Sequence, residues 1–485
     1  MLLLFLFHFL LYFSLFILSS PFYPLIWPDE VLFYSPASSF ASSGVLATTV
    51  LDGLIEGMEH HTLWMPPVYM LFNSLILSLS NQESINLLRF ASLFLGGFNA
   101  LIIMFIGKKM NFSKNSIWLL GSLVLGDFLF WKISSTARME SICLMFALLS
   151  ILFSFMKFRY SILITGMFAG LSFLSHPFGI VHSPIIAFNL WTQKRFDFKT
   201  LLFLGLGFLL PSSLWLAYIL PEWNLFLLQF GAQLGRKKDL LFSVFTLVTK
   251  IKIIFSGFRF PYFKLLSFLF LLGMAIWEIK SIRKQTERLD SIKFNTFIFP
   301  LSYLLIVLLF LFLSSESWYV YYLVPPISFL IVYFYEKNSR IGKGFLFLIL
   351  IYHLLGSVSF YYQNFIQYDL KKNTELFYQK ISTAIRGKNR IYLQSLPDPY
   401  FYLKENYPEK RILEFIPGEL PLPVEYAEET FLSQDAYIFY NQDLIHPYLK
   451  KYLLENENLF EKTIIDLPVP KGADYKLFAL IYSKI

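Results

Sequence analysis

The stretch LLRFASLFLGGFNALIIMFIGKKM, residues 87–110, decides the fold class of this chain. Residues 91–106 carry no charge, and two lysines follow them closely. An apolar helix of about 20 residues is long enough to cross the hydrocarbon core of a bilayer. The windows 2–18, 201–220 and 297–313 are free of charge in the same way. We therefore expect a polytopic α-helical membrane protein.

The composition agrees with this class. Of 485 residues, 56% are hydrophobic and 15% are charged, and the mean hydropathy is +0.56. Soluble proteins average about 45–50% apolar and about 25% charged residues. The only cysteine, Cys143, excludes an intrachain disulfide. The net charge of +8 is better explained by loops beside a membrane than by nucleic-acid binding, so we expect no nucleic-acid partner.

The charged residues divide the chain into two predicted domains. Residues 369–485 carry 15 Lys/Arg and 17 Asp/Glu, whereas residues 1–368 carry 26 and 16. We expect a transmembrane domain over 1–368, with interfacial helices in a first outer loop over 21–88, and a soluble domain over 369–485. The soluble part alternates helical patterns (372–385, 399–407) with strand patterns (390–394, 411–416, 435–440, 459–467, 475–482), which predicts a small α/β domain.

Apolar runs predict about eleven transmembrane helices. The run 66–80 is excluded because it is short and begins with two prolines. Residues 1–20 lack a basic n-region and are expected to form an uncleaved first span. The predicted spans are 2–20, 89–106, 116–134, 139–156, 160–174, 177–191, 200–219, 263–278, 294–313, 318–335 and 344–362.

The positive-inside rule orients these spans. With the N terminus inside, the inner loops hold 16 basic residues, whereas the outer loop 21–65 has no Lys or Arg and five acids. This arrangement places the soluble domain outside the cytoplasm. The outer loop 220–262 is an exception because it contains six basic residues, three of them consecutive at Arg236, Lys237 and Lys238; we read these as a possible anion-binding run.

The acids of WPDEVLFY, residues 27–34, lie at the outer end of the first span. In one interpretation, Asp29 and Glu30 lie in a solvated loop or begin a helix after Pro28. In the other, a carboxylate accepts a proton from an acceptor hydroxyl or binds a divalent metal ion. The residues alone leave both readings open.

Further polar and aromatic residues are predicted on the same outer face. Each has an ordinary explanation: Arg138 can pair with Glu140, and aromatic belts are common at membrane surfaces. Their gathering on one face favours a site there, because transporters place such groups near the bilayer midplane. These residues are His61, Arg138, Glu140, His176, Tyr319 and Tyr322.

The order of these motifs resembles the GT-C membrane glycosyltransferases of the protein O-mannosyltransferase and aminoarabinose-transferase group. The resemblance covers roughly residues 20–335. It rests on the Asp-Glu pair, followed by HTLWMPPVY (61–69), ARMES (137–141), LSHPFG (174–179) and YVYYLVPP (319–326). Glu140 stands where related sequences often have Asp, and PPVY lacks a directly preceding His or Lys. These departures leave the donor sugar and any metal open.

The resemblance implies transfer of a hexosyl or pentosyl group from a polyprenyl-phosphate donor to a hydroxyl of a lipid, glycan or protein, at the outer face of a bacterial inner membrane. Asp29 would be the base, Glu30 its support, and Arg138 a ligand of the donor phosphate. No cofactor is implied beyond a possible divalent metal ion. The other expected donor or substrate ligands are His61, Glu140, His176, Arg236, Lys237, Lys238, Tyr319 and Tyr322.

Two other classes of function remain open at the sequence level. A transporter or flippase of lipid-linked sugars would share the spans and a basic phosphate site, although it would be expected to show internal repeats. The other class is a non-catalytic assembly factor. The discriminating observation is whether Asp29 and Arg138 lie at one site.

Overall fold

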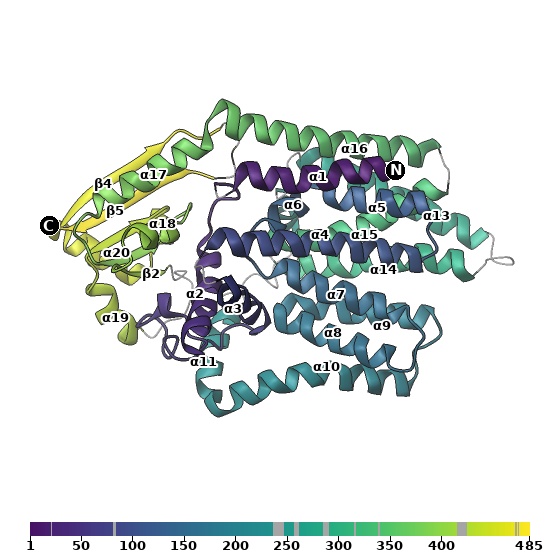
Figure 1. Cartoon of the computed structure of the whole chain (residues 1–485), viewed down its shortest axis with the longest axis horizontal. Coiled ribbons are helices and arrows are strands. Elements are labelled where there is room, and N and C mark those ends of the chain that lie inside the picture. The colour runs from purple at the N-terminus through teal and green to yellow at the C-terminus, as the bar shows by residue number, and fades with distance from the viewer. Residues whose placement is uncertain are drawn as a thin grey trace.

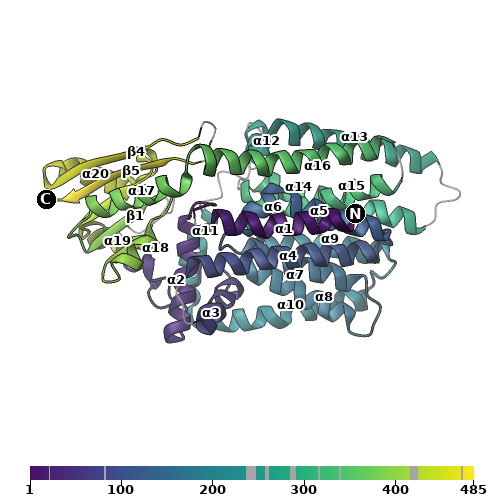
Figure 2. The same cartoon turned by 45° about the horizontal axis from the view of Figure 1, so that its top comes forward.

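The protein is a long helical bundle with a small sheet domain at one end (Figure 1). The computed structural model describes residues 1–20, 22–80, 84–235, 247–256, 261–284, 291–314, 317–337, 340–414, 424–470, 473 and 475–485. Most bundle helices run along the long axis of the molecule, and the N terminus lies at the end remote from the sheet domain. The two views in Figures 1 and 2 agree on this arrangement.

Each of the eleven predicted spans coincides with a helix or with a pair of consecutive helices of the bundle. The bundle helices are α1 (Leu2–Ser19), α4 (Ile85–Lys109), α5 (Lys114–Gly126), α6 (Phe128–Ser134), α7 (Glu140–Ser154), α8 (Ser161–Ser175), α9 (His182–Thr192), α10 (Phe198–Ile219), α13 (Pro261–Lys284), α14 (Ser291–Leu313), α15 (Val324–Glu336) and α16 (Arg340–Tyr361). Short 3-10 helices at Pro177–Val181 and Ser317–Leu323 precede α9 and α15.

Within the described ranges, seven helical segments are long and apolar enough to cross a membrane. An eighth is formed if α5 and α6, which meet at an angle of 63°, count as one span. Helices α7 and α8 are shorter and apolar. The prediction of a polytopic helical membrane protein is confirmed.

The segment between α1 and α4, predicted as the first outer loop, contains the two helices α2 (Pro28–Ser43) and α3 (Val68–Ser80). Both lie at the end of the bundle that faces the sheet domain (Figure 1). The loop after α10 contains α11 (Trp223–Gly235) and α12 (Leu247–Ser256). Residues 236–238, with the predicted basic run, lie outside the described residues.

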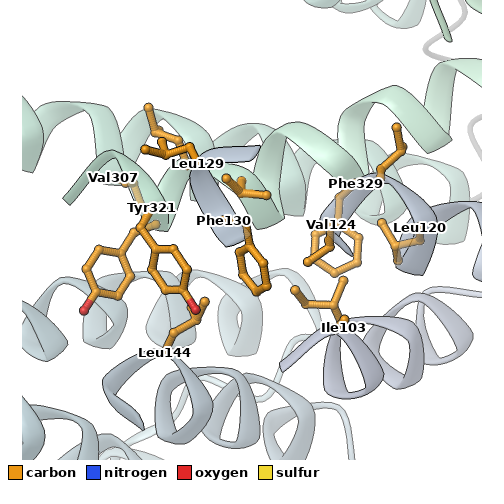
Figure 3. Close-up of a cluster of buried hydrophobic side chains, with 14 of the residues drawn as sticks. Ile103, Leu120, Val124, Leu129, Phe130, Leu144, Val307, Tyr321 and Phe329 are labelled. Carbon is orange, nitrogen blue, oxygen red and sulfur yellow. The ribbon is translucent and has the colours of Figure 1, made fainter. Parts of the chain in front are cut away.

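The bundle core is aromatic and aliphatic. Figure 3 shows Ile103, Val124, Phe130 and Tyr321 in one buried cluster between several helices. The rings of Phe130 and Tyr321 stack with centroids 4.8 Å apart. A stacked pair of aromatic rings stabilises the core beyond the contribution of the surface area that the rings bury.

A buried ion pair holds the break between α5 and α6. Oδ1 of Asp127 accepts hydrogen bonds from the backbone N–H groups of Leu129 (3.0 Å) and Phe130 (3.1 Å). Its Oδ2 lies 2.8 Å from Nζ of Lys264 on α13 and 3.6 Å from Nε2 of His353 on α16. Asp127 thus caps the first turn of α6, and its buried charge is paired.

The sheet domain contains a five-stranded sheet of order β2-β1-β3-β5-β4. Strands β1, β2 and β3 are parallel, and β5 runs antiparallel to β3 and β4. The predicted strands and the first two helices of this domain are confirmed, apart from residues 415–416, which the structure does not describe. Two further helices were not predicted. The elements are α17 (Leu370–Ala384), β1 (Arg390–Gln394), α18 (Tyr400–Asn406), β2 (Arg411–Glu414), α19 (Val424–Leu432), β3 (Ala436–Phe439), α20 (Pro447–Glu455), β4 (Phe460–Leu467) and β5 (Leu477–Lys484).

The sheet domain packs on the segment between α1 and α4. One buried apolar cluster includes Val31 and Tyr34 of α2 together with Tyr378, Tyr400 and Ile412 of the sheet domain. The ring of Tyr34 lies 4.9 Å from that of Phe401 in an edge-to-face contact. Because this core is shared, the sheet domain fixes the position of α2 at the end of the bundle.

Candidate active site

The two acids of WPDEVLFY begin α2 in different environments. Pro28 occupies the first turn, where a missing N–H costs nothing. The Asp29 side chain is 44% exposed, whereas that of Glu30 is fully buried. Acids are favourable in a first helical turn because its N–H groups lack intrahelical partners. The interpretation that these acids begin a helix therefore accounts for the local fold. The tertiary contacts of the two acids differ, and these contacts distinguish their roles.

Glu30 is held by four donors from three segments. Arg89 of α4 donates through Nε to Oε1 (2.8 Å) and through a terminal nitrogen to Oε2 (2.6 Å). The backbone N–H of Ala137 donates to Oε1 at 2.7 Å, and that of Trp27 to Oε2 at 3.1 Å. A buried carboxylate with both oxygens occupied is positioned to fix the start of α2 against the bundle.

Arg138 is the centre of the cluster. It lies in the turn between α6 and α7, and its side chain is almost buried. One terminal nitrogen lies 2.6 Å from Oδ2 of Asp29, and the other lies 3.0 Å from Oε1 of the buried Glu140. The guanidinium also stacks on Trp318, with Cζ 4.8 Å from the ring centroid. The sequence-predicted residues Asp29, Arg138 and Glu140 are therefore brought together.

His176 and Tyr319 form a pair beside this cluster. His176 Nδ1 accepts a hydrogen bond from the backbone N–H of Phe178 at 2.9 Å, and its Nε2 is 3.1 Å from the Tyr319 hydroxyl. Tyr319 is close enough to Arg138 to interact with it electrostatically. Tyr319 lies beside Arg138 because it directly follows Trp318, whose ring stacks on the Arg138 guanidinium.

Two other predicted residues lie outside the ion-paired cluster. The Tyr322 ring is fully buried and stacks on Phe178, and its centroid lies 6.5 Å from that of Tyr319. His61 packs against Tyr218 of α10, and its carbonyl accepts a hydrogen bond from Gln229. Neither residue has a hydrogen bond or ring contact with Arg138 in the part of the chain that the structure describes.

The site is acidic as far as it is described. The carboxylates of Asp29, Glu30 and Glu140 face the guanidiniums of Arg89 and Arg138, so carboxylates are in excess by one. Among the described residues, no group of three or more His, Cys, Asp and Glu side chains could hold a metal ion. Asp29 is the exposed acid, and Arg138 offers it a fixed N–H donor.

Two further residues of the site were not predicted. Arg89 is the first basic residue of the chain, and its position at the start of an apolar span was a usable signal. Tyr440 follows β3 in the sheet domain. Its half-burial raises its pKa, and the nearby Asp29 charge raises it further. No local pattern could indicate that Tyr440 lies near Asp29, because the two are far apart in sequence.

Comparisons with known proteins identify the fold. No protein-family model and no curated protein matches the sequence. Among solved structures, ArnT from Cupriavidus metallidurans bound to undecaprenyl phosphate is similar over 99% of this chain and 98% of its own, with a TM-score of 0.57 and 10% identity.

Two archaeal structures are similar over 99% of this chain and 74% of their own. The oligosaccharyltransferase of Archaeoglobus fulgidus tethered with an acceptor peptide has a TM-score of 0.54 and 10% identity. AglB from the same organism, in complex with an inhibitory peptide and a dolichol-phosphate, has a TM-score of 0.51 and 11% identity. At these identities the likeness establishes the fold. The chain is an integral multi-pass membrane protein with a GT-C-like fold.

Proposed function

We propose that this protein is a membrane glycosyltransferase that moves a sugar from a polyprenyl-phosphate carrier to a hydroxyl of a lipid, glycan or protein acceptor. The observation that carries the proposal is the Asp29–Arg138 pair. A half-exposed carboxylate and an almost buried guanidinium meet at the end of the bundle, beside the sheet domain. The solved structures of similar fold are described with undecaprenyl phosphate, dolichol-phosphate or an acceptor peptide, which supports this class of substrate.

The proposed reaction is a displacement at the anomeric carbon of the sugar. Asp29 takes the proton of the acceptor hydroxyl as its oxygen forms the new bond to that carbon. The bond between the carbon and the phosphate oxygen breaks, and its electron pair leaves with the polyprenyl phosphate. Arg138 stabilises the negative charge that develops on that phosphate. No further group is needed to balance the reaction, and no step in it is assigned to a metal ion.

The geometry suggests how donor binding could free the base. A terminal nitrogen of Arg138 now donates to Oδ2 of Asp29. A donor phosphate bound to the same nitrogen would compete with Asp29 for it, while Glu140 would keep the guanidinium in place through the other nitrogen. Asp29 would then accept the acceptor proton more readily. Tyr440 of the sheet domain lies near Asp29 and is a candidate wall of the acceptor site.

Substitution of Arg138 is expected to weaken use of the donor. A lost charge-assisted contact costs about 1.5–3 kcal/mol, so kcat/KM for donor should fall about tenfold to a hundredfold. Arg138→Lys should restore only part of it, because lysine lacks the planar fork. Retention of radiolabelled undecaprenyl phosphate on the purified protein, with undecaprenol as comparison, measures the same contact without a known acceptor.

The design must separate binding from folding. Arg138→Ala alone leaves the buried Glu140 charge without its partner, so the double variant Arg138→Ala/Glu140→Gln should be compared with it. Arg159→Ala, an exposed arginine of another loop, is the control. Full retention of undecaprenyl phosphate by the folded double variant would refute the phosphate contact.

The proposed topology places the N terminus in the cytoplasm and the sheet domain outside it, at a bacterial inner membrane. The opposite positions of the N terminus and the sheet domain along the bundle support it (Figure 1). In a cysteine-free background, an impermeant thiol reagent added to intact cells should label a cysteine at the exposed Thr383 of α17. It should not label one at the exposed Asn115 in the first turn of α5. Labelling of the Asn115 position and not of Thr383 would reverse the orientation.

A further inference from the structure

A buried group of ionisable side chains surrounds the break between α5 and α6. Asp127 lies at the break itself, Lys264 belongs to α13 and His353 belongs to α16. The three side chains are at most 8% exposed, and the helices that carry them are apolar spans. Ionisable groups in membrane-spanning segments are costly and usually have a function. The reaction proposed above uses none of these three residues.

His353 is the member of this group that has no hydrogen bond. Its Nε2 lies 3.6 Å from Oδ2 of Asp127, which is too long for a hydrogen bond. Neither ring nitrogen has a hydrogen-bond partner in the described ranges, although the residue is only 3% exposed. A neutral imidazole has one donor and one acceptor, and burying both without a partner is unfavourable. A small polar molecule in contact with His353 and Asp127 would satisfy them.

A cavity lies beside these two residues. Its polar wall consists of Asp127, Lys264, His353, Ser267 and Ser328, and the rest of its wall is apolar. The space that it offers to a water-sized molecule is about 20 Å³. A bound water needs at least about 10–15 Å³ of such space and two to four polar partners. The cavity therefore has room for a water molecule, whereas a lipid chain or headgroup is too large for it.

The charges at the cavity also favour a neutral occupant. Nζ of Lys264 lies 2.8 Å from Oδ2 of Asp127, so the two charges compensate each other. A bound cation would be repelled by Lys264, and a bound anion would be repelled by Asp127. Water both donates and accepts hydrogen bonds, so it suits the imidazole and the carboxylate together. Ordered waters are also a known way to satisfy the backbone groups that a broken helix frees inside a membrane.

The same carboxylate begins the helix that leads to Arg138. Asp127 caps the first turn of α6 through two backbone N–H groups. In the turn after α6, the Thr136 hydroxyl donates to the carbonyl oxygen of Ile133 at 2.6 Å, and the N–H of Arg138 donates to that of Thr136 at 2.9 Å. The cap, the helix and the turn are thus connected by hydrogen bonds, so a shift of Asp127 would move Arg138.

We propose that the cavity binds a water molecule that donates to the Asp127 carboxylate and forms a hydrogen bond with His353. Asp127, Lys264 and His353 are then positioning residues, because this hydrated ion pair holds α6 in the orientation that places Arg138 at the active site. None of the three touches the reacting atoms. The water site is independent of the proposed function, whereas its effect on donor use rests on that function.

Radiolytic footprinting of the full-length protein in detergent tests the water site. Short X-ray exposure turns bound water into hydroxyl radicals, these radicals oxidise the neighbouring side chains, and mass spectrometry locates the oxidised residues. His353 should be oxidised in the wild-type protein although it is buried. Absence of oxidation at His353 in the folded wild-type protein would overturn the water site.

A cavity-filling variant provides the matched comparison. In Ser328→Val, methyl groups occupy part of the space and a polar group of the wall is lost, so oxidation of His353 should fall to background. Ser302→Val changes a serine of α14 that is not part of the cavity wall, and it should leave His353 oxidation unchanged. Oxidation in folded Ser328→Val as strong as in the wild-type protein would also overturn the water site.

Substitutions of His353 test the positioning role. His353→Leu removes the hydrogen-bonding group, and the amount of undecaprenyl phosphate retained per folded molecule should then fall. Where transfer can be assayed, kcat/KM for the donor should fall about tenfold to a hundredfold, since a misplacement of about 1 Å can cost a hundredfold. His353→Gln keeps a hydrogen-bonding side chain and should recover most of the loss. His446→Leu, at a buried histidine of the sheet domain whose Nδ1 also lacks a partner among the described residues, is the control.

The outcomes separate this inference from the proposed function. A His353→Leu protein with a lower melting temperature but full retention of undecaprenyl phosphate per folded molecule would overturn the positioning role, because the residue would then only stabilise the fold. If His353 is oxidised as predicted and the wild-type protein neither retains undecaprenyl phosphate nor transfers sugar, the water site stands and the proposed function fails.

Discussion

Replacing Asp29 by asparagine should lower the rate of sugar transfer by about 10²–10⁴-fold, the usual contribution of a positioned general base. Asparagine keeps the size and shape of the side chain and can still accept a hydrogen bond from Arg138, but it cannot take up the acceptor proton. Because Asp29 is 44% exposed, the change should leave the melting temperature within a few degrees of the wild-type value. Initial rates at saturating donor measure the effect.

A matched control is available in the same segment between α1 and α4. Asp52 is 40% exposed and pairs with Arg411 of the sheet domain at 2.8 Å, so Asp52→Asn removes a similar surface ion pair away from Arg138. It should change transfer less than about twofold, since such pairs contribute about 0–1 kcal/mol. If Asp29→Asn transferred sugar at a near-normal rate, Asp29 would not be the general base, and its role would be limited to the first turn of α2.

The second large effect concerns stability. Glu30 and Arg89 form a fully buried ion pair, and removing one partner of such a pair costs about 3–5 kcal/mol because the other charge stays buried. Glu30→Gln is therefore expected to lower the free energy of unfolding by an amount in this range, seen as a reduced melting temperature in detergent. Per folded molecule, it should reduce transfer less than Asp29→Asn does.

A double variant shows whether the cost comes from the unpaired charge. Glu30→Gln/Arg89→Gln should recover part of the lost stability, because no net charge is then buried. Glu455→Gln, which breaks the exposed pair of Lys451 and Glu455, should have almost no effect. A Glu30→Gln protein as stable as the wild-type protein would contradict the role assigned to this pair.

Much of the fold could be predicted from the sequence because membrane spans are apolar over their whole length. The eleven predicted segments contain few charges, and each coincides with helix in the structure. The strands of the sheet domain were also predictable, since runs such as AYIF at Ala436–Phe439 are short, apolar and bounded by polar residues. Helices α19 and α20 were missed because their acidic and basic residues resemble a solvated loop.

The site could be predicted only in part. Asp29 and Arg138 were chosen because both lie at outer ends of predicted spans, and this shared face is what brings them together. The partner of Glu30 could not be deduced, since pairing with Arg89 depends on how α2 packs across α4.

The most direct test of the central claim is a transfer assay with purified protein in lipid vesicles. A panel of radiolabelled polyprenyl-phosphate sugars is supplied as donor, crude membrane lipids and glycans of the source cell as acceptors, and the assay is run with and without chelator. The account predicts that one donor loses its label to an acceptor, that polyprenyl phosphate accumulates, and that Asp29→Asn abolishes both. Folded wild-type protein that carries labelled donor across the vesicle membrane without cleaving it, or that leaves every donor intact, would contradict it.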